Sequence, residues 1–262
     1  MGDSSGDDPT HVQPGTRDAF AGHPRSTDLL RALNYPYGRP ARSFLFAGGT
    51  DHPIAALGRH HLAGRTPVIG YGSNASPEQL LRKFGDDASN AIPVLMGRLT
   101  GFDTVYSAHI TRYGALPATL IESADTEICV ALLWLTDPQL ERMHETEVTA
   151  ANYDYTTLSG LALDVELVGK IPEAGAYIGL HGYLIDTGLD RPVGDGSRSG
   201  GPIALSAVKA KDRKLPALDQ TEALAHAMAR LDLDLSLEEF VLRLIDDEAF
   251  RVECRDHLRK HG

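Results

Sequence analysis

Residues 66–76 read Thr-Pro-Val-Ile-Gly-Tyr-Gly-Ser-Asn-Ala-Ser, and this stretch decides the fold. Its first five residues are mainly apolar and predict a short buried strand. Ser76 then provides a helix N-cap, Pro77 suits the first helical position because it has no N–H, and Gln79 completes a capping box. Three residues give this helix its apolar face: Leu80, Leu81 and Phe84. The sequence therefore predicts a strand, a loop and a helix in direct succession.

The loop between that strand and that helix contains Tyr71, Gly72, Ser73 and Asn74. Backbone N–H groups in such a position can converge on an anion or a developing oxyanion, and glycine permits close approach to the backbone. The loop is not a P-loop, because no Gly-Lys-Ser/Thr follows. It is not a hydrolase nucleophile elbow either, because Tyr71 and Ala75 stand where that motif needs glycines. The alternative to a binding loop is a plain tight turn.

Strands and helices alternate on both sides of this loop. Strand-like runs lie at residues 94–99, 103–108, 118–121, 128–135, 153–158, 161–168 and 177–184. The run at 128–135 is apolar at every position, which predicts a central strand buried on both faces. Further helices are predicted at 136–147, after Leu205, near Thr221, and after Ser236, where Glu239 completes a capping box. This order of elements predicts an α+β fold.

We expect four segments along the chain. Residues 1–22 are polar and rich in Gly, Pro and Asp, which predicts a disordered acidic arm. Residues 23–65 are expected to wrap around the main domain in extended form. Residues 66–204 form the core, with a mobile Gly-rich loop at 186–201, and residues 205–262 form a C-terminal helical extension.

Composition and charge narrow the class of protein. The chain has 262 residues, of which 42% are hydrophobic, so a wholly disordered protein is excluded. A net charge of −11 repels nucleic acid and anionic lipid. No apolar run approaches the ~20 residues that span a bilayer, and the N-terminus does not resemble a signal peptide. We therefore expect a soluble, cytoplasmic protein with no nucleic-acid or membrane partner.

Cysteines and histidines give no sign of a metal site. Cys129 and Cys254 lack metal-ligand spacing and are predicted to be free thiols in a reducing compartment. Adjacent residues such as His60-His61 seldom chelate together and have no evident third ligand, so we expect surface histidines. Two further histidines lie singly in strand-like surroundings, which favours structural roles: His109 and His181.

The predicted helix 136–147 carries one carboxylate on a largely apolar face. At about 100° per residue, Glu147 shares a stripe with Met143 and His144, whereas Glu145 points away. Burial and the helix C-terminus both disfavour the ionised form of Glu147. That environment is typical of a group that transfers protons. The alternative is a helix that ends by Glu145, with Glu147 as a solvated carboxylate.

Taken together, these pieces resemble the gamma-glutamylcyclotransferase-like family. The matching elements are, in order, residues 71–74, Gly97-Arg98-Leu99, Gly101-Phe102, residues 117–120, the 128–135 strand, the 136–147 helix and Asn152-Tyr153. The resemblance covers about residues 66–184, with residues 202–213 as a further match. It implies a small mixed β-barrel with flanking helices. The helical pattern of residues 205–262 adds a C-terminal helical extension to this barrel.

The resemblance also implies roles for individual residues. Residues 71–74 would line the cavity for a γ-glutamyl group, and Glu147 would transfer the proton; Glu145 is the competing alignment. Tyr153, close to that carboxylate, either orients a polar ligand or is a half-buried strand aromatic. Ala75 stands where a larger apolar residue is frequent and His144 where an aspartate is frequent, which bears on the identity of the substrate.

The implied reaction is an intramolecular cyclisation. The α-amine of a γ-glutamyl group attacks its own γ-carbonyl and releases 5-oxoproline and a free amine, with Glu147 as acid/base and without a metal or organic cofactor. A second hypothesis is a non-catalytic small-molecule-binding or regulatory module on the same fold. A third is a serine-dependent amidohydrolase that uses Ser73, for which no suitably placed histidine is evident. The sequence indicates neither the released amine nor a protein partner.

Overall fold

The computed structural model describes residues 22–54, 59–147, 152–186 and 200–260. The predicted acidic arm lies outside these ranges except for Gly22. The predicted mobile loop at 186–201 also lies outside them except at its two ends.

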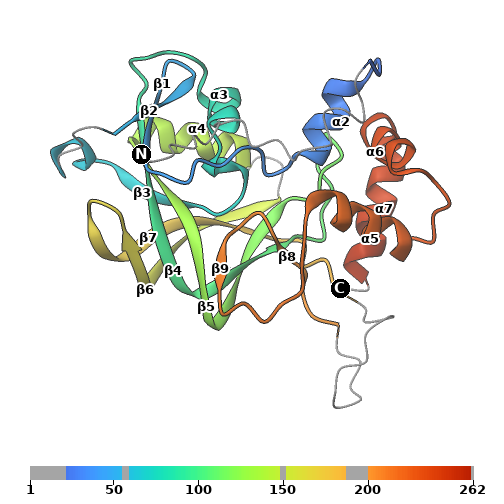
Figure 1. The fold of residues 1–262 in the computed structure, drawn as a ribbon. Coiled ribbons are helices and arrows are strands. Elements are labelled where there is room, and N and C mark those ends of the chain that lie inside the picture. Colours follow the sequence, from blue (N-terminus) through green and yellow to red (C-terminus); the bar gives the residue numbers. More distant parts are fainter. Residues whose placement is uncertain (1–21, 55–58, 148–151, 187–199, 261–262) are drawn as a thin grey trace, which may run out of the picture.

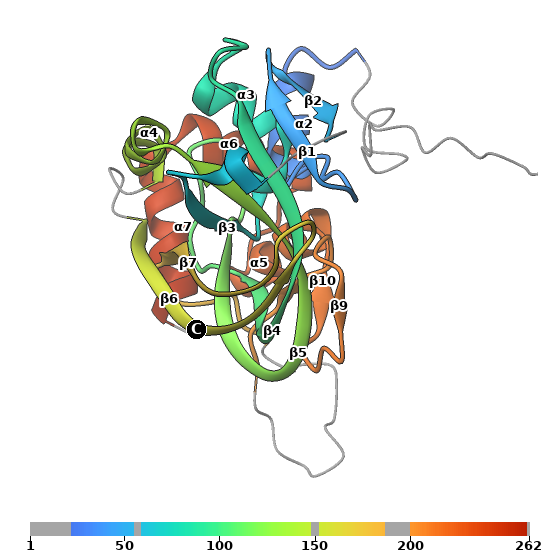
Figure 2. The same ribbon diagram turned by 90° about the vertical axis from the view of Figure 1, so that its left-hand side faces the viewer.

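Five strands close into a mixed barrel (Figures 1 and 2). They are β3 (Thr66–Gly70), β4 (Ile92–Tyr106), β5 (Ala118–Leu135), β6 (Tyr153–Val165) and β7 (Gly169–Gly179). Strand β4 pairs with β5 and β6, β6 pairs with β7, β7 pairs with β3, and β3 pairs with β5, so the ring is complete. The β3–β7 contact is parallel and the other four are antiparallel. The predicted α+β fold with a small mixed barrel is confirmed.

Several predicted strand boundaries were wrong. The runs at 94–99 and 103–108 form one strand, β4, in which the register shifts after Thr100 and Gly101 takes a φ of 92°. A bulge with a positive φ suits glycine, so this residue bends the strand without ending it. Strand β5 likewise joins 118–121 to 128–135. Only residues 177–179 of the run at 177–184 belong to β7, whose earlier part contains Gly169, Pro172 and Gly175, which weaken the strand pattern in the sequence.

Both faces of β5 are buried, as the apolar run at 128–135 predicts. Val130 and Leu132 belong to a core cluster that draws on all five barrel strands. Ala131 and Leu133 belong to a second cluster. The second cluster also includes residues of helices α3 (Pro77–Phe84) and α4 (Asp137–Glu147), which therefore pack on the other face of the strand.

A further correction concerns the residues after Leu205, which form short strands rather than a helix. Strand β8 (Ala204–Leu205) pairs with β4, and strand β9 (Ala210–Lys211) pairs with β5. Pairing with the long barrel strands therefore outweighs the local pattern that favoured a helix. The small strands are β1 (Phe44–Ala47), β2 (Thr50–Pro53), β8 (Ala204–Leu205), β9 (Ala210–Lys211) and β10 (Ala217–Leu218).

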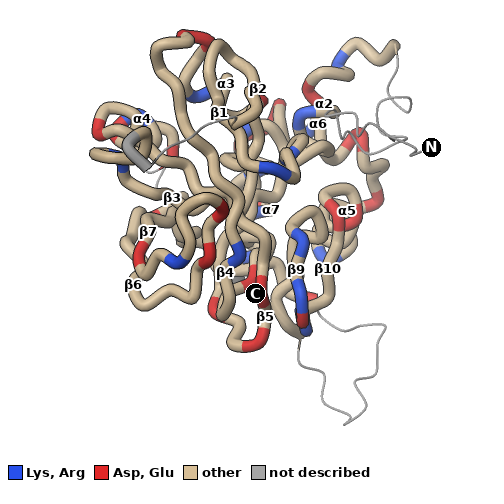
Figure 3. Tube along the Cα trace, turned by 60° about the vertical axis from the view of Figure 1, so that its left-hand side comes forward, with Lys and Arg blue, Asp and Glu red and all other residues tan. Residues whose placement is uncertain are grey.

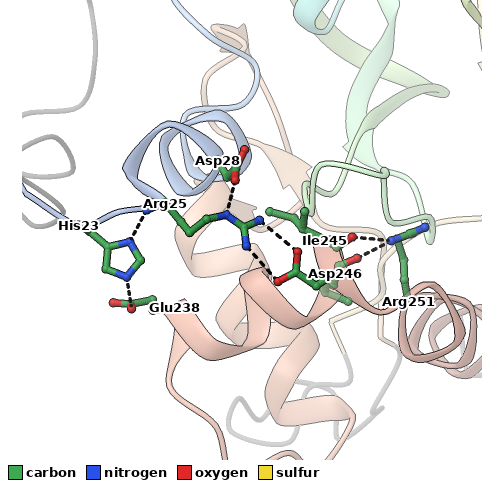
Figure 4. Close-up of polar contacts among 8 residues, drawn as sticks. His23, Arg25, Asp28, Glu238, Ile245, Asp246 and Arg251 are labelled. Atoms are coloured by element: carbon green, nitrogen blue, oxygen red, sulfur yellow. Dashed lines mark hydrogen bonds and ion pairs between the residues drawn. The ribbon is translucent and has the colours of Figure 1, made fainter.

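Four helices gather at one end of the barrel: α2 (Ser26–Leu33), α5 (Gln220–Arg230), α6 (Leu237–Asp246) and α7 (Glu248–Lys260) (Figure 1). The capping box predicted at Ser236 and Glu239 is present at the start of α6. Arg25, just before α2, donates two hydrogen bonds to Asp246 of α6, at 3.0 and 3.1 Å (Figure 4). These polar groups are partly exposed and stabilise little, so burial of Leu29 and its neighbours holds the helices together.

In the view of Figure 3, acidic and basic residues are spread over many elements, with basic residues following one another around β9. In the described part of the chain, no helix combines the length and apolarity needed to cross a membrane.

One ion pair of the barrel is buried and ties β4 to the segment after β9. The Asp103 side chain is fully buried, and Arg213 donates hydrogen bonds of 2.7, 2.9 and 3.1 Å to its two oxygens. We expect Arg213→Met to lower the free energy of unfolding by about 3–5 kcal/mol, because the substitution leaves a buried carboxylate without its charge partner. Urea denaturation at neutral pH measures this change.

The matched control is Arg98→Met. Arg98 pairs with Asp164 at 3.7 Å, and both side chains are more than half exposed. Its loss should cost less than about 1 kcal/mol. Equal losses in the two variants would contradict a specific role for the buried pair.

Candidate active site

Helix α4 presents Glu147 to helix α3. Glu147 is the last residue of α4, and its side chain is 16% exposed. On the same helix Met143 is fully buried, whereas Glu145 is exposed and accepts a 2.7 Å hydrogen bond from Arg142. The competing carboxylate therefore points to solvent, and Glu147 points toward the protein.

The loop after β3 reaches the same carboxylate. Ser73, Asn74 and Ala75 form a short 3-10 turn, η2 (Ser73–Ala75), between β3 and α3. Asn74 Nδ2 donates a 2.8 Å hydrogen bond to Glu147 Oε1. The Asn74 Oδ1 atom is buried and has no hydrogen-bond partner among the described residues. The fold thus joins two predicted site elements that lie 73 residues apart in the sequence.

A lysine that the sequence analysis missed completes the cluster. Lys83 Nζ donates to Glu147 Oε1 and lies 3.2 Å from Met143 Sδ, and the Lys83 side chain is only 6% exposed. Glu147 is therefore an ion-paired carboxylate, not the unpaired one that its apolar stripe suggested. The available signal was spacing: Lys83 follows Leu80 by three residues and so shares the buried face of α3. Leu81, which was expected on that face, is 40% exposed.

The start of α3 differs from the prediction in its side chains. Ser76 is the N-cap residue and Pro77 takes the first position, as predicted. The Ser76 hydroxyl, however, is buried without a hydrogen-bond partner, and Gln79 accepts a hydrogen bond from Arg82 instead. The predicted capping box was wrong because Gln79 turns outward toward Arg82.

Buried tyrosines surround the loop. The Tyr71 hydroxyl donates to the backbone carbonyl of Tyr177, and the Tyr153 hydroxyl donates to the Ala118 carbonyl at 2.9 Å. Burial, reinforced by the charge of Glu147, raises the pKa of both phenols well above the ordinary value. Both therefore stay neutral and keep donating their hydroxyl protons to these backbone carbonyls.

The predicted wrap supplies two supports that the sequence analysis did not identify. Tyr35 accepts a 2.9 Å hydrogen bond from the Ala118 N–H, and a Cβ added to Gly72 would lie 2.7 Å from the Tyr35 hydroxyl. Arg39 donates to the Tyr71 carbonyl at 3.0 Å, and burial lowers the pKa of this guanidinium to about 10. The close approach to Tyr35 explains why position 72 is a glycine.

The two histidines expected to stand alone form a pair. The rings of His109 and His181 stack with centroids 4.8 Å apart, and His181 Nε2 lies 2.9 Å from Asn152 Oδ1. Burial, followed by the charges of His181 and nearby arginines of α7, lowers the pKa of His109 to about 3. Within the described ranges, no three His, Cys, Asp or Glu side chains gather as a metal site would require.

Solved structures that are similar to this chain include one whose name is that of the family the sequence resembles. An uncharacterized protein from Homo sapiens is 13% identical over 68% of this chain and 85% of its own, with a TM-score of 0.38. A gamma-glutamyl cyclotransferase is 14% identical over 76% of this chain and 99% of its own, with a TM-score of 0.37. A protein from Arabidopsis thaliana is 13% identical over 44% of this chain and 62% of its own, with a TM-score of 0.32.

No protein-family model matches the sequence, and no curated protein matches it either. At these identities and TM-scores, the structural similarity carries no information about a reaction or a substrate. The chemistry of the site has to be argued from its own residues.

We expect Gly72→Ala to destabilise the protein by about 1–3 kcal/mol, because the new methyl group displaces the Tyr35 hydroxyl. Tyr35→Phe alone should cost about 1–3 kcal/mol, because it leaves the buried Ala118 N–H unpaired. The double variant should lose less than the sum of the two, since the clash needs the hydroxyl. Denaturant unfolding of all four proteins measures the coupling, and strict additivity would contradict the proposed close contact.

The His109 pKa of about 3 makes stability depend on pH. The unfolded chain binds a proton at this residue below about pH 6.5 and the folded chain does not, so stability should fall as the pH drops from about 6.5 toward 3. His109→Phe keeps a ring against His181 and should flatten this slope. Urea midpoints measured across that range test the expectation, and an unchanged slope in the variant would contradict it.

Proposed function

We propose that this protein is a cyclotransferase that releases 5-oxoproline and a free amine from a γ-glutamyl amide. The observation that carries the proposal is the 2.8 Å hydrogen bond from Asn74 to Glu147. It joins the Tyr-Gly-Ser-Asn loop to the one carboxylate that the sequence pattern selects for proton transfer. The two free cysteines, Cys129 and Cys254, suit a reducing compartment, and we propose a cytoplasmic location.

In the proposed reaction, the substrate supplies its own nucleophile. Glu147 accepts a proton from the α-ammonium group, and the resulting amine attacks the γ-carbonyl carbon to close a five-membered ring. Glu147 then returns the proton to the leaving nitrogen as the old C–N bond breaks, and the ring nitrogen gives its second proton to the released amine. Backbone N–H groups of residues 71–74 are proposed to hold the oxyanion or the α-carboxylate, and the phenol oxygens of Tyr71 and Tyr153 to accept hydrogen bonds from the substrate. The reaction requires no metal or organic cofactor.

One observation favours a second candidate, a non-catalytic module that binds a small molecule. Because Lys83 pairs with Glu147, the buried carboxylate is compensated and needs no catalytic role to justify its burial. Such a module would bind γ-glutamyl compounds without turning them over.

The test is 5-oxoproline release from a panel of γ-glutamyl dipeptides and γ-glutamylamines. We expect Glu147→Gln to lower kcat by about 10²–10⁴-fold, because the amide cannot accept the proton, while the fold is retained. Glu145→Gln is the matched control and should keep wild-type activity, since that carboxylate is exposed.

The possible outcomes distinguish the cyclotransferase from the binding module and test the role of Glu147. Release by wild type and by Glu145→Gln alone supports the cyclotransferase. Equal activity in Glu147→Gln would overturn the role of Glu147. Ligand-dependent thermal stabilisation of the wild-type protein with no release from any compound would favour the binding module.

A further inference from the structure

We propose that Lys83 is a positioning residue for the reaction, which fixes one carboxylate oxygen of Glu147 and leaves the other oxygen to the substrate amine. The inference rests on the proposed function, and it concerns a residue outside the stretches that carry the family resemblance. Lys83 lies in the last turn of α3 and donates a hydrogen bond to the carboxylate that α4 carries.

The geometry assigns the two oxygens of Glu147 different tasks. Asn74 Nδ2 and Lys83 Nζ both donate to Oε1. Among the described residues, Oε2 takes part in neither of these contacts. One oxygen is thus fixed by the protein, and the other is the candidate to receive the proton.

Helices α3 and α4 hold the ammonium in place. Met143 of α4 contacts Lys83 Nζ through its sulfur at 3.2 Å, and Arg142 Nε donates to the Lys83 carbonyl at 3.0 Å. A thioether is a weak acceptor, so Glu147 is the group that compensates the charge. The lysine therefore keeps a fixed position relative to the carboxylate.

Stability does not account for a lysine at this position. Desolvating two charges offsets much of their attraction, and an apolar side chain of similar volume often stabilises a protein equally well. The neighbouring side chains include Leu80 and Met143, both buried, which would suit such a residue. A charge kept there, in contact with the proposed acid/base, is explained by the chemistry of that group.

Lys83 keeps the carboxylate in place for both proton transfers. Its positive charge and hydrogen bond hold Oε1, so Oε2 keeps one position from which it can take a proton of the substrate ammonium and later return it to the leaving nitrogen. The ring nitrogen gives its second proton to the released amine, so the step balances without a further reactant.

The other titratable groups near Glu147 do not supply this charge. The nearby phenols, with pKa values raised mainly by burial, stay neutral: Tyr35, Tyr71, Tyr113, Tyr153 and Tyr177. His144 of α4 lies 2.9 Å from the Tyr177 hydroxyl through Nδ1. Arg142 and Glu145 pair with each other on the exposed side of the helix. Lys83 is thus the cation in direct contact with the carboxylate among the described residues.

The first experiment compares kcat and KM of wild type, Lys83→Met and Lys83→Arg. We expect Lys83→Met to lower kcat about 10–100-fold with KM little changed, because the carboxylate is no longer held in place. Lys83→Arg keeps a cation that donates hydrogen bonds, and its kcat should stay close to wild type. Arg82→Met is the matched control, because Arg82 is an adjacent cation of α3 that pairs with Glu78 instead.

A folded Lys83→Met variant with wild-type kcat would overturn the proposal. Lys83→Gln, which keeps a hydrogen-bond donor without the charge, is the second variant if Lys83→Met does not fold. The second experiment needs no activity and compares crystal structures of the wild type and the folded variant. We expect Glu147 Oε1 to keep its contact with Asn74 Nδ2 in the wild type and to move in the variant, and an unmoved carboxylate would overturn the proposal.

The two experiments distinguish failure of the cyclotransferase proposal from failure of the role proposed for Lys83. If no γ-glutamyl compound is turned over, the cyclotransferase proposal fails, and the two crystal structures still show whether Lys83 positions Glu147. If turnover occurs and the carboxylate keeps its place in the variant, the cyclotransferase survives and the role of Lys83 fails.

Discussion

The parallel contact between β3 and β7 is the constraint on which the site depends. It closes the barrel through one register pair, Val68 with Gly175, while β3 also pairs with β5 along its full length. Because β3 ends at Gly70, the following loop starts at a point fixed by both neighbours. The Tyr71 hydroxyl then bonds to the Tyr177 carbonyl of β7, which continues the link beyond the strand. The loop is therefore anchored before it reaches the carboxylate.

Segments outside the barrel complete the environment of that loop. Tyr35 and Arg39 precede the barrel in sequence, yet they contact Gly72 and the Tyr71 carbonyl. Lys83 comes from the helix that follows the loop. The local chain thus provides the binding groups, and tertiary packing provides their rigidity and charge balance. This division explains why the loop sequence alone does not distinguish a binding site from a tight turn.

The division between local chain and tertiary packing also determines which features the sequence could predict. The apolar run at 128–135 and the signals at Ser76 and Pro77 have local causes, so the central strand and the start of α3 were predictable. The strands after Leu205 depend on pairing with β4 and β5, and a local pattern does not contain that information. At the site, the direction of Glu147 follows from helical spacing, whereas its contact with Lys83 depends on how α3 packs against α4.

The unpaired atom of Asn74 indicates what kind of ligand the site suits. Its Oδ1 is buried without a partner, which costs about 1–3 kcal/mol unless a donor arrives. Its Nδ2 is already committed to Glu147, whose own Oε2 is a second acceptor on the same cluster. Two acceptors held together by a loop and a helix favour a ligand that brings several N–H donors on one atom. An α-ammonium group has that chemistry, and a carboxylate or phosphate does not. The requirement holds for a substrate that reacts and equally for a ligand that is only bound.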